Sequence, residues 1–243
     1  MRSANPALNK DTFKQLSTTR YTTNAESMSI QGTVNKTGFM LILILLSASY
    51  SWTHPQYFPI FLPVGIIGGL VFAMITIFKK TWAPVTGPVY ALLEGLFLGC
   101  ISMYFERAYP GIVMNAVMLT FGTLGALLLA YKSGLIKATE NFKLGVAAAT
   151  GGVFFLYLSS FILGFFGVNM TFLHDSSLLS IGISFVIVII AALNLVLDFD
   201  FIEQGAKQGA PRYLEWYASF GLMVTLIWLY VEILHLLSKL QRR

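Results

Sequence analysis

The chain has 243 residues, of which 56% are hydrophobic and only 11% are charged. Soluble domains carry about 25% charged residues, so this composition excludes a disordered protein, a nucleic-acid-binding module and an ordinary soluble enzyme. The one cysteine, Cys100, excludes a disulfide scaffold. The net charge of +5 comes from basic residues in tails and short loops, which is typical of membrane topology. The remaining class is a polytopic membrane protein.

The first 37 residues are polar and rich in Ser, Thr and Asn. A cleavable signal peptide needs an apolar core of ~7–15 residues near its start, and this segment has none. We interpret residues 1–37 as a polar cytoplasmic tail with room for a short helix near residues 9–16. Residues 38–243 then form the membrane domain.

Seven apolar runs follow, each near the ~20 residues that cross a hydrocarbon core as a helix. The runs are continuous rather than alternating, so the period-two strands of a membrane barrel are not expected. We therefore predict an all-α fold, a bundle of seven transmembrane helices. The expected spans are 38–52 (extending toward 58), 60–78, 88–105, 111–131, 144–168, about 178–201 and about 216–238. Two small-residue pairs, Gly65-x-x-x-Gly69 and Gly95-x-x-x-Gly99, predict close helix packing.

The distribution of basic residues predicts the orientation. Lysine and arginine occur in the tail and in alternate loops, 79–87, 132–143 and 203–215, whereas the loops between these are poor in them. By the positive-inside rule the tail is cytoplasmic, and we expect a multi-pass protein of the inner (plasma) membrane. Seven spans place the basic C-terminus outside, against the rule, and six spans with a re-entrant last segment would place it inside. We favour seven, since residues 216–238 are long enough to cross.

A few acids inside the apolar runs are the candidates for function, because a charge at the bilayer centre costs roughly 2.5–3.5 kcal/mol. They are Glu94 in the third run, Asp198 and Asp200 in the sixth, and Glu232 in the seventh. Glu94 and Asp198 should each lie about 9–10 Å from the cytoplasmic end of their helix, by the rise per residue. We therefore expect these two acids to lie near each other, facing the bundle interior.

The face of the sixth helix separates its polar residues. Asn194 precedes Asp198 by one turn and shares its face, so both are expected to point inward. Asp200 is expected on a wetter stripe with Glu203 and Lys207, toward the membrane interface. The alternative is that Asp198 pairs with Glu94 in neutral form and only fixes helix packing, and that Glu232 is likewise a protonated acid bonded across the bundle.

Other site chemistries find no support in the sequence. The histidines, His54, His174 and His235, lie in three different segments, and no zinc-ligand spacing or phosphate-binding glycine loop occurs. His235 is expected at the membrane interface, and Cys100 only in packing. No nucleophile–base constellation appears, so we do not expect an enzyme, a resident cofactor or a nucleic-acid partner.

Three stretches resemble signature segments of the Bax inhibitor-1 family in its bacterial branch. Tyr90–Gly99 (YALLEGLFLG) is similar to the third-helix segment of that family. Leu193–Ile202 (LNLVLDFDFI) resembles the sixth-helix signature, in which an aspartate is followed four residues later by isoleucine. Trp228–Leu237 (WLYVEILHLL) resembles the last-helix Leu-Tyr-Leu-acid-x-Ile run. The span count also agrees, across residues 38–238.

The resemblance implies a pH-sensitive calcium leak. An acid on the sixth helix and one on the last, here Asp198 and Glu232, would sense pH and contact calcium transiently. A basic residue near the end of the second helix, Lys79 or Lys80, would latch the sixth-helix acid. Two carboxylates in a low-dielectric interior cannot both ionise cheaply, so one holds a proton, and oxygen ligands suit calcium.

Two departures from the family pattern leave the pairing of the acids open. Glu232 is a glutamate where the family has aspartate, so its carboxylate reaches further. The Asp198–Glu232 spacing is also longer, with residues 204–212 as the expected insertion. An antiparallel turn near Gly209 would carry Glu232 a turn or more past Asp198, unless residues 211–217 lie along the interface. In that arrangement Glu94 is the nearer partner of Asp198.

Two other functions stay open. The protein could be a membrane regulatory protein without transport activity that binds a membrane protease or other membrane partner, with the tail as its handle. It could be a small-molecule transporter, although internal repeats and helices broken at midspan are not evident. The expected partners are the lipid bilayer and calcium or another cation.

Overall fold

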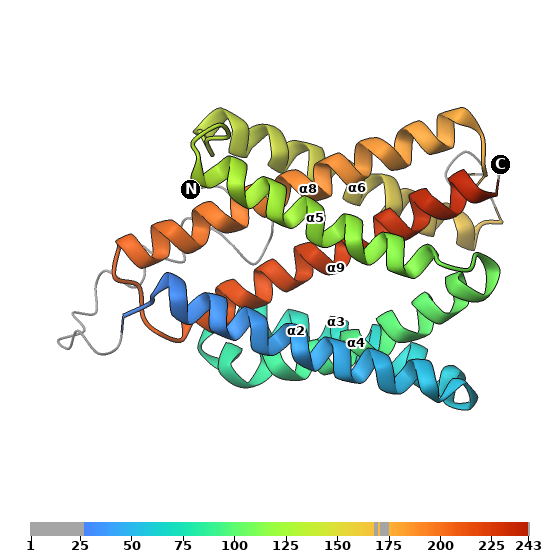
Figure 1. Ribbon diagram of the computed structural model, residues 1–243, viewed down its shortest axis with the longest axis horizontal. Coiled ribbons are helices and arrows are strands. Elements are labelled where there is room, and N and C mark those ends of the chain that lie inside the picture. The colour runs from blue at the N-terminus through green and yellow to red at the C-terminus, as the bar shows by residue number, and fades with distance from the viewer. Residues whose placement is uncertain (1–26, 168–169, 171–174, 243) are drawn as a thin grey trace. The chain divides into compact units, whose positions relative to one another are not determined.

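The computed structural model describes residues 27–167, 170 and 175–242, which are almost entirely helical (Figure 1). This described part contains seven helices long and apolar enough to cross a membrane, which confirms the predicted all-α fold. The helices are α2 (Ile30–Thr53), α3 (Phe58–Phe78), α4 (Ala83–Ala108), α5 (Ile112–Lys132), α6 (Glu140–Phe165), α8 (Leu178–Lys207) and α9 (Leu214–Gln241). The short 3-10 turns η1 (Pro55–Tyr57) and η2 (Lys80–Trp82) join α2 to α3 and α3 to α4.

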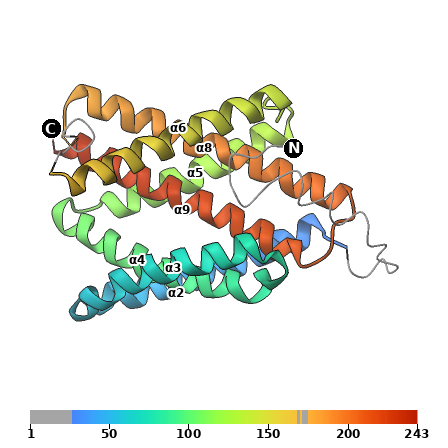
Figure 2. The same ribbon diagram turned by 180° about the vertical axis from the view of Figure 1, so that it is seen from behind.

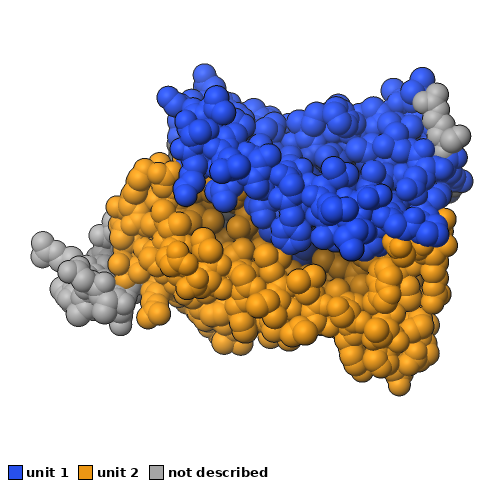
Figure 3. Space-filling model, viewed as in Figure 1, with its two compact units in different colours: residues 1–5, 109–197, 225–243 blue, residues 6–108, 198–224 orange. Residues whose placement is uncertain are grey.

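The described residues form two compact units (Figure 3). Unit 1 contains α5, α6, the first part of α8 and the last part of α9, from residues 109–197 and 225–242. Unit 2 contains α2, α3, α4, the end of α8 from Asp198, and the start of α9 up to Val224. The two acids that the sequence analysis paired therefore belong to different units, with Asp198 in unit 2 and Glu232 in unit 1.

Helix α2 begins earlier than the sequence predicts. Its first residue is Ile30, whereas the predicted span starts at residue 38. Ser29 caps this end, since its hydroxyl accepts a hydrogen bond of 2.9 Å from the Gly32 amide. Thr33 is fully buried, and its hydroxyl donates to the Ser29 carbonyl at 2.9 Å. The polar residues of this turn thus bond to the helix itself, which lets the helix extend into the polar segment. The short helix predicted near residues 9–16 lies outside the described residues.

The small-residue pair of α4 packs against α2 in unit 2, where the helices run side by side in both views (Figures 1 and 2). A Cβ atom at Gly95 would collide with the Ser47 side chain and the Ile44 backbone, and one at Gly99 would collide with Ser51. Ser47 donates its hydroxyl to the Ile44 carbonyl at 3.2 Å, so its close approach leaves no hydroxyl donor unpaired. The packing role predicted for this pair is confirmed.

The pair in α3 packs against α4 in the same way. A Cβ atom at Gly65 would lie 2.8 Å from the Phe97 amide nitrogen, closer than real contacts allow. A Cβ atom at Gly69 would lie 2.5 Å from a carboxyl oxygen of Glu94. Gly69 therefore provides the space that the Glu94 carboxyl occupies.

We expect Gly95→Ala to destabilise the protein by about 1–3 kcal/mol, the usual cost of overpacking a close contact. The added methyl group meets the Ile44 backbone, which cannot move without α2. Unfolding of the purified protein in detergent measures the loss. The matched control is Gly122→Ala on α5, where nothing lies within 4 Å of the new atom. Equal losses in the two variants would contradict the packing argument.

Candidate functional site

The end of α8 buries both of its aspartates. Asp198 is 1% exposed, in agreement with the predicted inward position. Asp200 is 8% exposed, so the prediction that it points to a wet interface is wrong. Phe199 and Phe201 between and beside them are also buried, which shows that this part of α8 is enclosed on every side. Asp200 lies on the opposite face of α8 from Asp198, but that face is buried as well.

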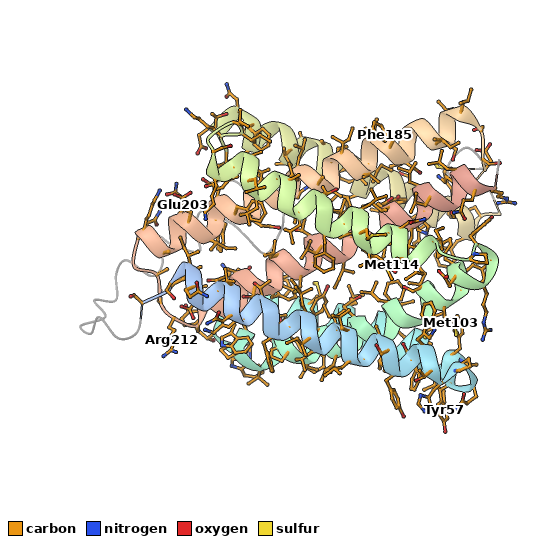
Figure 4. All side chains as sticks on the ribbon, viewed as in Figure 1. Tyr57, Met103, Met114, Phe185, Glu203 and Arg212 are labelled. Atoms are coloured by element: carbon orange, nitrogen blue, oxygen red, sulfur yellow. The ribbon has the colours of Figure 1, made fainter. Side chains whose placement is uncertain are left out.

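The next turn of α8 does reach solvent. Glu203 and Lys207 form an ion pair at the i,i+4 spacing, and the Lys207 side chain is 64% exposed. Figure 4 shows Glu203 and Arg212 at the end of unit 2 where α8 turns into α9, with Tyr57 at the opposite end of that unit. Of the predicted wet stripe, Glu203 and Lys207 are confirmed.

Asn194 lies one turn before Asp198 and is 3% exposed. Its amide nitrogen donates to the Thr150 hydroxyl of α6 at 2.8 Å and to the Ile190 carbonyl at 2.8 Å. Both amide hydrogens are thereby used. Asn194 is inward-facing as predicted, and it links α8 to α6 within unit 1.

Glu232 of α9 is 3% exposed and has two neutral donors in unit 1. The Tyr157 hydroxyl of α6 lies 2.8 Å from Oε1 and 3.0 Å from Oε2, and the Trp228 indole nitrogen lies 3.1 Å from Oε1. Because an indole can only donate, Oε1 accepts there, and the tyrosine hydroxyl lies across both oxygens. Sequence reasoning missed both partners. The Trp228–Glu232 spacing of four was a usable signal, whereas nothing in the sequence pairs α6 with α9.

The two latch candidates differ in what they reach. The Lys79 ammonium lies 4.4 Å from the centre of the Trp82 ring, within the connection between α3 and α4. The Lys80 ammonium lies 5.6 Å from the centre of the Tyr217 ring of α9. Tyr217 in turn lies 6.5 Å from Phe201 of α8, between ring centres. Of the two lysines, Lys80 is thus the one in contact with the hairpin of α8 and α9 in unit 2.

A buried carboxylate that sequence reasoning missed lies at the start of α9. Glu215 is 2% exposed and accepts from the Ser29 amide at 2.8 Å and the Ser29 hydroxyl at 2.9 Å. Its second oxygen forms an ion pair with Lys36 of α2. Ser219 extends this Glu215 cluster, because its hydroxyl lies 3.0 Å from the Thr33 carbonyl. The carboxylate lies at the N-terminal ends of both α2 and α9, where helix dipoles favour a negative charge.

The chain just before α2 is fixed to the same place. The Met28 amide donates to the Ala210 carbonyl at 2.6 Å, and Ser27 forms an isolated antiparallel bridge with Pro211. Glycine at position 32 leaves room for the Glu215 carboxylate, which a Cβ atom there would displace. The start of α2 is therefore bound to the turn between α8 and α9 by backbone, polar and charged contacts.

Within the described ranges, no three His, Cys, Asp or Glu side chains gather in a group that could hold a metal ion. Cys100 is buried and free, and His174 lies outside the described residues.

We expect Lys36→Met to destabilise the protein by about 3 kcal/mol, because it leaves the Glu215 charge buried without its cation. The matched control is Lys207→Met, which breaks the exposed Glu203–Lys207 pair and should cost at most about 1 kcal/mol. Unfolding in detergent compares the two. A Lys36 variant as stable as the Lys207 variant would show that the ion pair of the Glu215 cluster does not stabilise the fold.

Comparison with known proteins places the chain in a family. A family model described as Bax inhibitor 1 like matches residues 5–242, essentially the whole chain. No curated protein and no solved structure matches it. The matched range contains all seven apolar helices together with Asp198 and Glu232. The chain is therefore a multi-pass membrane protein that belongs to the Bax inhibitor 1-like family.

Proposed function

We propose that this protein is a pH-sensitive leak for calcium or a similar cation, and that it is not an enzyme. The observation that carries the proposal is the burial of two acids, Asp198 and Glu232, which are 1% and 3% exposed on the last two apolar helices. Buried acids inside apolar spans are costly and mark ion or proton pathways by default. The family assignment supports the same reading.

In this proposal calcium is the transported substrate and touches the carboxylates only in passing. Oxygen atoms are the ligands that calcium prefers, and tight calcium sites use six to eight of them. Within the described residues no three His, Cys, Asp or Glu side chains form such a group, which suits passage of the ion rather than storage. An ionised Asp198 attracts the cation, and its protonation removes that attraction. Flux that depends on this carboxylate is therefore lost as the pH falls through its titration.

Lys80 is the proposed latch. Its contact with Tyr217, which packs near Phe201 of α8, brings a positive charge to the helix hairpin that carries Asp198. A cation held there offsets the negative charge of the acid and opposes the entry of calcium. Lys79 lies over the Trp82 ring, within the connection between α3 and α4, and is not the proposed latch.

The test is calcium entry into liposomes containing the purified protein, between about pH 6 and 8, where a carboxyl whose charged form is disfavoured by burial titrates. Asp198→Asn should lower the flux and flatten its pH dependence. Glu232→Gln should do the same if the two acids are coupled, and the double variant should then add little beyond either single change. Lys80→Ala should raise the resting leak.

Lys79→Ala is the matched control for the latch, since it removes the same charge one residue away and should leave the leak unchanged. Equal effects of the two lysine variants would reject Lys80 as the latch. Absent flux in the wild-type protein, or an unchanged pH profile in Asp198→Asn, would reject the leak. The protein would then be better explained as a regulator of a membrane protease or another membrane partner.

We also propose an inner-membrane location with a cytoplasmic N-terminus and an external C-terminus, from the alternation of basic loops. Reporter fusions after Arg243 test the orientation, because the reporter is active on one side only. A C-terminal reporter that is active in the cytoplasm would overturn this topology.

A further inference from the structure

The two halves of α6 differ in how much of their surface is buried. Of the 26 residues of α6, only Lys143, Val146 and Val153 are buried, and all three lie in its first fourteen positions. From residue 154 to 165, a stretch that is fully described, no side chain is buried. Large apolar side chains here, such as Phe155 and Phe161, are 65% exposed. Apolar packing therefore holds the first half of α6 more closely than the second, where Leu156 and Leu163 are only half-buried.

Two hydrogen bonds tie α6 to its neighbours at different points along its length. Thr150 accepts from Asn194 of α8 at 2.8 Å, at the level where apolar packing ends. Tyr157 donates to Glu232 of α9 at 2.8 Å, beyond that level. Tyr157 as a whole is 39% exposed, whereas the carboxyl that its hydroxyl bonds belongs to a residue that is 3% exposed. The second hydrogen bond is a polar attachment for a half-helix in which no side chain is fully buried.

Two adjacent glycines separate the two ties. Gly151 and Gly152 follow Thr150 directly, and nothing lies within 4 Å of a Cβ atom built on either. Glycine lowers the cost of bending a helix, and sharp bends concentrate at such positions. Along α6, the hydrogen-bonded Thr150 is thus followed by two glycines that ease bending and then by the hydrogen-bonded Tyr157.

A residue of α9 itself orients the Glu232 carboxyl for its contact with Tyr157. The Trp228 indole, one turn earlier on α9, donates to Oε1 at 3.1 Å and fixes the carboxyl from behind. Tyr157 lies eight residues before the end of α6 and Glu232 nine before the end of α9, each about 12–14 Å from its helix end by the rise per residue. The bond therefore joins two helices at matching depth, well inside their apolar spans.

We propose that the Tyr157–Glu232 bond is a catch that holds the second half of α6 against α9, and that Tyr157 is the positioning residue for Glu232. While the bond is made, the Glu232 carboxyl is turned to α6. When it breaks, the half-helix beyond Gly152 swings and the carboxyl becomes available to a cation. The consequence for flux rests on the proposed leak, whereas the consequence for the motion of α6 does not.

The test uses Tyr157→Phe, which removes the hydroxyl and keeps the ring. A spin label on Phe161→Cys reports the second half of α6, and one on Ala148→Cys reports the first half, in protein reconstituted into lipid vesicles. The label at position 161 should become more mobile in Tyr157→Phe, and the label at 148 should not. Adding Gly152→Ala, which stiffens the bend, should restore much of the lost order at 161.

Tyr104→Phe on α4 is the matched control, because it makes the same change at a tyrosine that is 64% exposed. It should alter neither label nor flux. If the leak exists, Tyr157→Phe should raise calcium flux at constant pH about tenfold, the usual effect of losing a hydrogen bond to a charged group. Glu232→Gln should lower flux while keeping an oxygen that accepts from Tyr157.

The outcomes separate the catch from the leak. Unchanged mobility at position 161 in Tyr157→Phe overturns the catch. Raised mobility at 161 with no calcium flux in the wild-type protein supports the catch and rejects the leak. Raised mobility with wild-type flux that Tyr157→Phe leaves unchanged overturns the positioning role of Tyr157.

Discussion

The cost of placing a carboxylate in an apolar bundle organises this protein. A buried polar group must be hydrogen-bonded, and a buried charge must also be compensated. The fold meets this requirement in a different way at each acid. Glu215 receives a lysine and two donors from Ser29 at the start of α2. Glu232 receives two neutral donors from Tyr157 and Trp228. Each solution also fastens two helices together, so the acids act as connectors as well as charges.

This double role follows from the surroundings of a membrane protein. Lipid tails are as apolar as leucine side chains, so apolar surface alone gives helices little reason to associate. Close packing at glycine and hydrogen bonds across helices supply the cohesion instead. Unit 2 uses both, through the close contacts at Gly95 and Gly65 and through the Glu215 cluster. Unit 1 uses hydrogen bonds across helices, through Asn194 and Glu232. Its helix α6 has the smallest buried share of the seven described spans.

The sequence predicts elements whose cause is local and misses those whose cause is tertiary. Continuous apolar runs and the glycine spacing depend on neighbouring residues, so the seven spans and both packing pairs could be predicted. The start of α2 could not, because Ser29 is held by Glu215, far away in the chain. The burial of Asp200 was missed for the same reason, since a helix face says nothing about what encloses it. Glu232 was found by its place in an apolar run, and Tyr157 carried no signal.

The Glu215 cluster also orders events during synthesis. Ser29 and Glu215 are 186 positions apart, and the ribosome makes one near the beginning of the chain and the other near its end. At about 5–20 residues per second, the start of α2 waits roughly ten to forty seconds for its carboxylate. Throughout that time Lys36 lacks the charge that balances it in the finished protein. A chain that stops before α9 therefore lacks the acceptor for the Ser29 amide and hydroxyl and the anion for Lys36.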